Sequence, residues 1–413
     1  MANSPSVARQ PWCATITLVL GGCGHFLLIA ASLATAWRGT RTVERVRRIP
    51  PLAEASGDED GSVTIVVPAR DEAPRIGACV DALRAQTMPD VRIVVVDDDS
   101  SDGTGQIAAR HADDDPRVTI VRGEGRPAGW SGKVAAMQIG LDTDRVARDR
   151  SGTAPPEWLL FVDADTQLAP ELLGRLRATA VQHDADLVSA AGTPPPGGSA
   201  AWSLLMPTGI VFIGEHADPQ GRARRALAIG QCLLVRRDRF DAVGGWTALR
   251  DRRTEDVLLA TRVRDDGGRT RLVDAHGLVT TSGLDPFGAG WASFRKTLVA
   301  ATERSVLVLA GGGLTHAAMS LAGPVAVVCG LRVARTPGRS GRGRSARAIG
   351  LVTTGLLGWG AAAAAHHRAA RLMRTRTAFA PLAPLIWALF GAVLLDGARV
   401  VLRGTAGWKS RDQ

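Results

Sequence analysis

Apolar residues follow two patterns along this chain: short strand-like runs in the middle and long uninterrupted runs near both ends. The short runs are rich in valine, isoleucine and leucine, and they alternate with helix-like stretches. Near-continuous apolar strands separated by helices are typical of a largely parallel sheet covered on both faces. The pattern therefore predicts an α/β domain. The expected strands are 63–67, 92–96, 118–121, 158–162 and 187–190, and the expected helices include 75–86, 104–111 and 170–182.

The first long run, Ile16 to Trp37, contains 22 residues without a formal charge. A membrane-spanning helix needs about 20 predominantly apolar residues, so this run predicts a span. A cleaved signal peptide is the alternative, because Ala34-Thr35-Ala36 resembles a cleavage site. The run is longer than a usual signal core, and five arginines follow it between residues 38 and 48. Because such clusters stay on the cytoplasmic side, we expect an uncleaved anchor and a cytoplasmic body.

Three further apolar stretches lie near the other end, at about 306–331, 349–365 and 378–395. The segments between them are basic, with six arginines in 332–347 and four in 368–376. Three full crossings would place one basic segment outside, against the tendency of positive charge to stay inside. The first stretch contains three consecutive glycines and a proline, so a hairpin or an interfacial segment is the alternative. The number of crossings stays open, but the pattern predicts a multi-pass protein of the cell membrane.

The charge distribution agrees with this division of the chain. The net charge is +10, yet residues 304–413 hold 15 Lys+Arg against two acids, which leaves residues 1–303 with a net charge of −3. A nucleic-acid partner for the body is therefore excluded, and attraction to anionic membrane lipids explains the basic end. The five cysteines form no close pair, so neither a zinc ribbon nor a disulfide scaffold is supported. The expected parts are a tail (1–15), a membrane helix (16–37), a basic linker (38–61), the α/β domain (62–303) and a basic membrane region (304–413).

Carboxylates follow the predicted strands at the points where ligands bind in such sheets. Asp97 and Asp98 follow the second strand, and Asp163-Ala164-Asp165 follows the strand 158–162. Residues two apart on an extended segment point to the same side, so Asp163 and Asp165 can face one hard divalent cation. A solvated turn is the alternative for an isolated D-x-D, but its position beside Asp97 and Asp98 favours a metal site. Crowded carboxylates repel each other, and a divalent ion on a diphosphate would neutralise them.

A helix expected after residue 130 begins with Trp130-Ser131-Gly132-Lys133. Backbone donors at this helix start and the Lys133 ammonium suit a phosphate group. An ordinary surface lysine is the alternative interpretation. The loop after the first strand is neither G-x-G-x-x-G nor a G-x-x-x-x-G-K-[ST] loop, so dinucleotide binding has no support.

Taken in order, several segments resemble the family-2 glycosyltransferases of the GT-A fold. They are VTIVVPARDEA, VVVDDDSSDGT, GWSGKVAAM, LLFVDADT, CLLVRRDRFDAVGGW and TEDVLLATRV. With its membrane segments, the chain is most similar to the hopanoid-associated and carotenoid glycosyltransferases. The closing Gly407-Trp408-Lys409-Ser410-Arg411 resembles the W-K-G-R ending of that group, with serine in place of glycine.

This resemblance implies roles for particular residues. Asp163 and Asp165 would bind Mg²⁺ or Mn²⁺, and Asp256 would be the general base of an inverting transfer. An acidic pair at a helix N-terminus is the alternative for Glu255-Asp256. The residues expected to bind the nucleotide sugar, a UDP-sugar in the first instance, are Pro68, Glu72, Asp97, Asp98, Lys133 and Asp163.

Two departures from the family pattern bear on the reaction. Processive relatives carry a Gln-x-x-Arg-Trp motif, whereas residues 291–297 read WASFRKT. The difference favours transfer of a single sugar to a lipid, such as a hopanoid, a carotenoid or a polyprenyl phosphate. A processive polysaccharide synthase and a catalytically silent membrane-anchored binding module are the alternatives. Asp71 stands where most relatives have asparagine, with no consequence evident from sequence.

Overall fold

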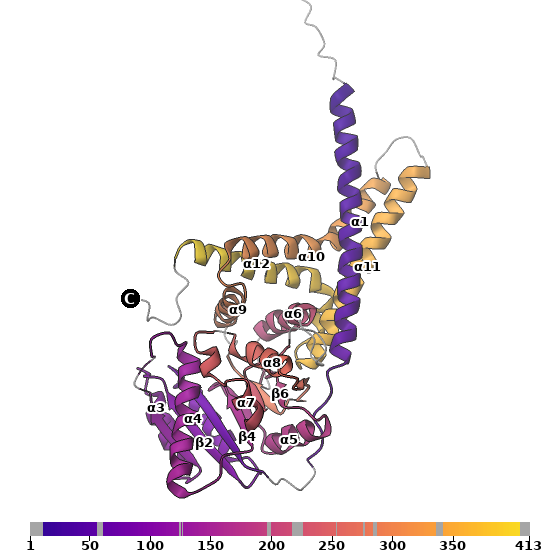
Figure 1. Ribbon diagram of the computed structural model, residues 1–413. Coiled ribbons are helices and arrows are strands. Elements are labelled where there is room, and N and C mark those ends of the chain that lie inside the picture. Colours follow the sequence, from indigo (N-terminus) through magenta and orange to yellow (C-terminus); the bar gives the residue numbers. More distant parts are fainter. Residues whose placement is uncertain are drawn as a thin grey trace, which may run out of the picture.

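The computed structural model shows an α/β domain joined to a group of long helices (Figure 1). It describes residues 11–55, 61–123, 125, 127–195, 200–216, 226–252, 254–275, 277–283, 287–335 and 342–404. Part of the arginine-rich segment 332–347 and the whole of the closing segment 407–411 lie outside the described residues.

The sheet of the domain has seven strands in the order β3-β2-β1-β4-β7-β6-β8. β1 pairs in parallel with β2 and β4, and β7 is antiparallel to both of its neighbours. The predicted α/β class with a mostly parallel sheet is confirmed. The strands of this sheet are β1 (Val63–Ala69), β2 (Val91–Asp97), β3 (Val118–Arg122), β4 (Trp158–Val162), β6 (Leu187–Ala190), β7 (Cys232–Arg236) and β8 (Thr270–Val273).

A second sheet has two strands, β5 (Thr166–Leu168) and β9 (Val279–Thr281). Thr166 lies opposite Thr281 in this antiparallel pair. Because β5 begins directly after Asp165, this pairing brings the segment that follows β9 to the edge where β4 ends. Sequence patterns did not predict this small sheet, since three-residue strands carry too little periodicity to be recognised.

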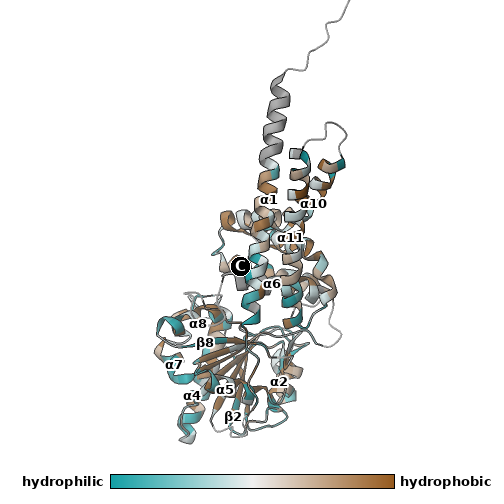
Figure 2. Ribbon diagram, turned by 90° about the vertical axis from the view of Figure 1, so that its right-hand side faces the viewer, coloured by the Kyte–Doolittle hydropathy of each residue, from teal (hydrophilic) through white to brown (hydrophobic). Residues whose placement is uncertain are grey.

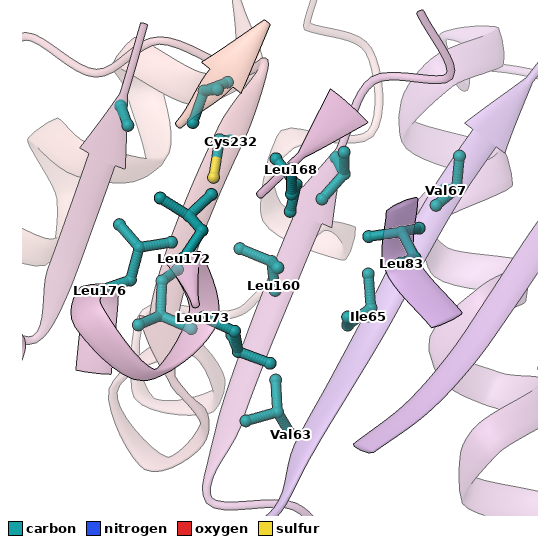
Figure 3. Packing of buried hydrophobic residues seen from close by; sticks show 14 of the residues in the cluster. Val63, Ile65, Val67, Leu83, Leu160, Leu168, Leu172, Leu173, Leu176 and Cys232 are labelled. Carbon is teal, nitrogen blue, oxygen red and sulfur yellow. The ribbon is translucent and has the colours of Figure 1, made fainter. Parts of the chain in front are cut away.

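Helices cover both faces of the large sheet, because successive side chains of a strand point to opposite faces. Val63, Ile65 and Val67 of β1 pack on one side, together with Leu160, against leucines of two helices (Figure 3). On the other face, Val66 packs against a second group of helices. The first face is covered by α2 (Ile76–Arg84), α3 (Thr104–Ala112) and α5 (Leu172–Gln182), and the second by α4 (Gly132–Ser151), α7 (Arg237–Ala242) and α8 (Glu255–Asp265).

Three helices outside this domain are long and apolar enough to cross a membrane, by length and composition. They are α10 (Val306–Arg335), α11 (Arg342–Leu372) and the segment 377–402, which comprises the 3₁₀ turn η2 (Thr377–Leu382) and α12 (Ala383–Leu402). α10 continues as one helix through its glycines and Pro324, so the hairpin alternative is wrong. α1 (Pro11–Arg47) contains the expected first span, which stays a prediction because the side chains of residues 11–23 are not among those the structure describes.

The long helices contact one another at small residues. A Cβ atom on Gly323 of α10 would lie 2.9 Å from the carbonyl oxygen of Gly355 of α11, and one on Gly391 of α12 would lie 2.8 Å from that of Gly313. Only residues without a side chain allow backbones to approach this closely, and such contacts are characteristic of helices packed in membranes. In Figure 2, hydrophobic residues, drawn in brown, occur along these helices as well as in the central strands.

Two shorter helices lie between the α/β domain and the long helices. These are α6 (Ala200–His216) and α9 (Phe287–Ala301). In Figure 1 they separate the sheet from the pair formed by α10 and α12. Trp202 and Met206 of α6 are buried with residues of α11 and α12, and Ile229 of the α/β domain packs against the same cluster.

A buried ion pair ties α4 to the sheet and provides a test of the fold. Asp144 and Arg148 are each 3% exposed and lie 2.9 Å apart, and the hydroxyl of Thr64 in β1 donates to the same carboxylate. Replacing one partner leaves a buried charge without compensation, which costs about 3–5 kcal/mol. We expect Asp144→Ala to lower the thermal unfolding midpoint of the full-length protein in detergent by roughly 10 °C.

Asp142→Ala is the matched control for this prediction, because Asp142 lies on the same helix in an exposed 3.8 Å pair with Arg145. Such a pair contributes at most about 1 kcal/mol. Equal midpoints for the two variants would contradict the structural role given to Asp144.

Candidate active site

The carboxyl ends of β1, β2 and β4 meet at one edge of the sheet, because these neighbouring strands run in parallel. The loops that follow them hold most of the residues singled out from the sequence. Pro68 is the last residue but one of β1, and Glu72 lies in the loop after this strand. The structure thus brings the strand-end carboxylates to the same edge, as the sequence predicts.

Hydrogen bonds join the loop after β1 to the loop after β2. The N–H of Asp71 donates to the Ser100 hydroxyl at 3.0 Å, and its carboxylate accepts the N–H of Ser101 at 3.0 Å. The N–H of Glu72 donates to the Thr104 hydroxyl at 2.8 Å. Asp71 has a φ of 51°, which aspartate and asparagine adopt more readily than most residues. Both properties explain why either residue type suits this position.

The two aspartates that follow β2 have different environments. One Asp97 oxygen accepts the N–H of Ser100 at 2.9 Å, and the other lies against Gly105 at the start of α3. Asp98 is 6% exposed, and its carboxylate lies 3.3 Å from the guanidinium of Arg70. Asp97 therefore stabilises the loop, while Asp98 lies against Gly132 at the start of α4.

Lys133 connects two groups of carboxylates at the centre of the site. Its Nζ lies 2.7 Å from Oδ1 of Asp163 and 2.9 Å from Oε1 of Glu255. Burial alone would lower the pKa of this ammonium, but Asp163, Glu255 and Asp256 together raise it well above its usual value. The surface-lysine alternative is therefore wrong: Lys133 is a charged, half-buried group shared between the residues after β4 and those at the start of α8.

Asp256 is held in place by backbone donors. The N–H of Gly230 donates to Oδ2 at 2.9 Å, and the N–H of Val257 donates to Oδ1 at 2.8 Å. Burial and the neighbouring Glu255 carboxylate raise the pKa of Asp256 to about 6, although Lys133 and the two N–H donors oppose that shift. A carboxylate with a pKa in this range accepts protons at neutral pH better than an ordinary aspartate does.

Asp165 lies beside the segment that follows β9. A Cβ atom added to Gly283 would collide with its carboxylate. Burial, and then the Asp163 and Glu72 carboxylates, raise the pKa of Asp165 to about 6, while Arg75 opposes the shift. Asp165 and the neighbouring Asp163, which is paired with Lys133, form an acidic environment that favours an added positive charge.

No group of three or more His, Cys, Asp and Glu side chains that could hold a metal ion occurs among the described residues. A smaller number of ligands can suffice for Mg²⁺, which proteins often bind through one or two carboxylates while waters and substrate phosphates complete the shell. Asp163 and Asp165 fit that arrangement.

Sequence patterns alone did not indicate three residues of this site. Gly230 and Gly283 lie next to Asp256 and Asp165, but single glycines in loops carry no distinctive signal. Arg70 directly follows β1 and pairs with Asp98. The sequence offered one indication of the role of Arg70, namely that a charged residue directly follows a buried strand.

Comparisons with known proteins agree with this geometry. Residues 64–244 match the model of glycosyl transferase family 2. The chain is 28% identical over 239 residues to the succinoglycan biosynthesis protein ExoA of Rhizobium meliloti, which is 54% of this chain and 65% of ExoA. It is 30% identical over 115 residues to a 4,4'-diaponeurosporenoate glycosyltransferase of Staphylococcus haemolyticus, which is 28% of this chain and 27% of that protein.

Among solved structures, the chain is similar to the mannosyltransferase PcManGT of Pyrobaculum calidifontis in complex with GDP-Man and Mn²⁺. The TM-score is 0.49 and the identity 18%, over 96% of this chain and 99% of that one. The matched segments span less than two thirds of the length of ExoA and of the diaponeurosporenoate enzyme.

The sheet, the strand-end carboxylates and the family match define a glycosyltransferase domain of the GT-A fold. Residues 64–244 of this chain form a glycosyl transferase family 2 domain.

The joined loops after β1 and β2 generate a prediction about Asp71. Asp71→Asn retains an oxygen that accepts the N–H of Ser101, whereas Asp71→Ala loses it. A lost hydrogen bond of about 1 kcal/mol corresponds to roughly fivefold faster opening. We expect amide hydrogen exchange over residues 98–104 to rise about fivefold in Asp71→Ala and to stay near wild type in Asp71→Asn. Equal exchange in both variants would show that the side chain does not hold the loops together.

Proposed function

We propose that this protein is a membrane-bound, metal-dependent, inverting glycosyltransferase that moves one sugar from a nucleotide-sugar donor to a lipid acceptor. The observation that carries the proposal is the network around Lys133. It joins Asp163, a candidate metal ligand, to Glu255 beside Asp256, the candidate base. Two reaction partners, one bound at each end of this network, would meet at the same edge of the sheet.

The donor site is formed by the loops after β1 and β2 and by the start of α4. Glu72 and Asp98 would bind the nucleoside, with Pro68 and Asp97 shaping the loops around it. Lys133 and the N-terminus of α4 suit the diphosphate, because backbone N–H groups and an ammonium favour anions there. A UDP-sugar is the proposed donor.

A divalent cation, Mg²⁺ or Mn²⁺, fits Asp163 and Asp165, where it would stabilise the negative charge of the leaving diphosphate. The two residues lie at the carboxyl end of β4, and Gly283 leaves room for the Asp165 carboxylate. Lys133 neutralises part of the negative charge of Asp163.

Asp256 accounts for the transfer step. An acceptor hydroxyl beside this carboxylate would give its proton to Asp256 as its oxygen forms a bond with the anomeric carbon. The bond from that carbon to the diphosphate oxygen breaks at the same time, with inversion and without a covalent enzyme intermediate. The N–H groups of Gly230 and Val257 fix the carboxylate in one orientation, and its raised pKa suits a base at neutral pH.

The position of the base supports a lipid acceptor. Ile229 directly precedes Gly230 and packs against a buried cluster from α6, α11 and α12 that includes Trp202 and Trp387. Asp256, which accepts the N–H of Gly230, is therefore linked through Ile229 to two of the helices that are apolar enough to cross a membrane. A hopanoid, a carotenoid or a polyprenyl phosphate would satisfy this arrangement, with the catalytic domain at the cytoplasmic face and the basic segments near anionic lipids.

A donor screen tests the proposal. Membranes containing the protein would receive radiolabelled UDP-glucose, UDP-galactose, UDP-N-acetylglucosamine or GDP-mannose, with Mn²⁺ or with EDTA. We expect metal-dependent label in one lipid-sized product, which mass spectrometry would identify. Label in an insoluble polymer would instead indicate a processive synthase. If no donor binds to the protein and no donor yields a labelled product, the catalytically silent binding module becomes the favoured interpretation.

Asp256→Asn provides a second test. The variant keeps the size of the side chain and one of its two acceptor oxygens but cannot take up the proton, so we expect donor binding to persist while turnover falls by at least about 10²-fold. In the wild type, turnover at saturating Mn²⁺ should fall as the pH drops below about 6, because Asp256 must be ionised to act. Saturating metal keeps Asp165 ionised during this measurement. Unchanged turnover in the variant would remove Asp256 from the role of base.

Gly283→Ala tests the metal assignment. The added methyl group would displace the Asp165 carboxylate, whereas Gly288→Ala, five residues further on, has open space around the new atom. We expect Gly283→Ala to raise the Mn²⁺ concentration for half-maximal turnover about tenfold, which corresponds to about 1.4 kcal/mol. The Gly288→Ala control should keep the wild-type requirement. Identical metal titrations for both variants would argue against Asp165 as a ligand.

A further inference from the structure

Asp396 is unusual among the residues of the long apolar helices. It lies on α12, and it is the one acidic residue within the three described segments that are apolar enough to cross a membrane. An ionisable side chain on such a helix is costly unless it is paired, and where it occurs it generally has a functional partner. Its partners therefore show what this position is used for.

Two of the partners of Asp396 come from a different helix. The indole N–H of Trp291 and the guanidinium of Arg295, both on α9, donate to Oδ2 at 2.9 Å each. The third partner, Arg399, lies on α12 itself and donates to Oδ1. The Asp396 side chain is 16% exposed, so water contributes little to its solvation. One carboxylate thus fixes two successive turns of α9 on α12.

Apolar contacts surround these polar bonds. Phe294 of α9 meets Phe390 of α12 edge to face, with ring centroids 5.7 Å apart. Leu298 and Val299 are buried in the same cluster. Because the polar bonds have fixed directions, they set the rotation and register of α9, whereas the apolar contacts alone would tolerate sliding.

The other end of α9 leads to the candidate metal site. α9 begins at Phe287, one turn before Trp291, and the two rings lie 6.0 Å apart. Gly283, four residues before Phe287, is the residue that lies against the Asp165 carboxylate. The residue that lies against Asp165 therefore stands only four positions before the helix that Asp396 holds.

We propose that Asp396 is a positioning residue for the transfer reaction. It fixes α9 on the last long helix, and through α9 it holds Gly283 against Asp165, so that the metal-binding carboxylate is placed only when the domain is docked on its own apolar helices. This inference rests on the proposed function, and it adds to the site a residue more than 200 positions away from Asp165 in sequence. Asp396 touches no reacting atom; it acts through α9.

The test uses the full-length protein in lipid nanodiscs. Asp396→Asn weakens the bonds to α9, and Trp291→Phe removes one donor while keeping an aromatic ring at that position. We expect Asp396→Asn to raise the Mn²⁺ concentration for half-maximal turnover at least tenfold and to accelerate amide exchange over residues 277–283. Trp291→Phe should show a smaller effect in the same direction. Asp396→Glu keeps the charge and should recover the wild-type metal requirement to within about threefold.

Arg399→Gln is the matched control, because it removes a partner of the same carboxylate without touching α9. It should leave metal requirement and exchange at wild-type values. Exchange over 277–283 that stays at the wild-type rate in Asp396→Asn would overturn the proposal, as would a uniform rise in exchange over the whole domain, which indicates general destabilisation. The exchange measurement needs no turnover, so it decides the role of Asp396 even if the donor screen fails and removes the proposed function.

Discussion

The repulsion between carboxylates at the edge of the sheet is the constraint on which the rest of the site depends. Asp163, Asp165, Glu255 and Asp256 lie close together and partly out of water, and such charges destabilise one another without a cation between them. Lys133 supplies one positive charge, 2.7 Å from Asp163 and 2.9 Å from Glu255. It leaves Asp165 and Asp256 with raised pKa values. The site is therefore prepared for a further cation on one side and for a proton on the other.

This arrangement is supported by segments far apart in the sequence. Gly230 orients Asp256, and its neighbour Ile229 packs against α6, α11 and α12. Gly283 lies against Asp165, and the helix that follows it is bonded to Asp396 of α12. Both halves of the site thus rest on the helices that are apolar enough to cross a membrane. A lipid acceptor would explain why the catalytic edge is built against these helices.

Short-range patterns predicted much of the domain. All five expected strands are present, because each is a short, mostly apolar run bounded by turn residues. The antiparallel strand β7 was not assigned, although its residues CLLVR are equally apolar. Strand direction depends on how the chain returns to the sheet, and apolar periodicity does not encode that path. The three-residue strands β5 and β9 were missed because they are too short to show a period.

The sequence by itself determined the α/β class, the parallel strand ends that gather Asp98, Asp163 and Asp165, and the apolar character of both ends of the chain, because each follows from residues adjacent in sequence. The tertiary structure alone decided that Lys133 pairs with both Asp163 and Glu255, that α10 is a single helix, and that Asp396 reaches α9. The contacts of Lys133 and of Asp396 join residues separated by 30 to more than 100 positions. Which distant side chains meet is set by packing of whole elements, and no local pattern contains that information.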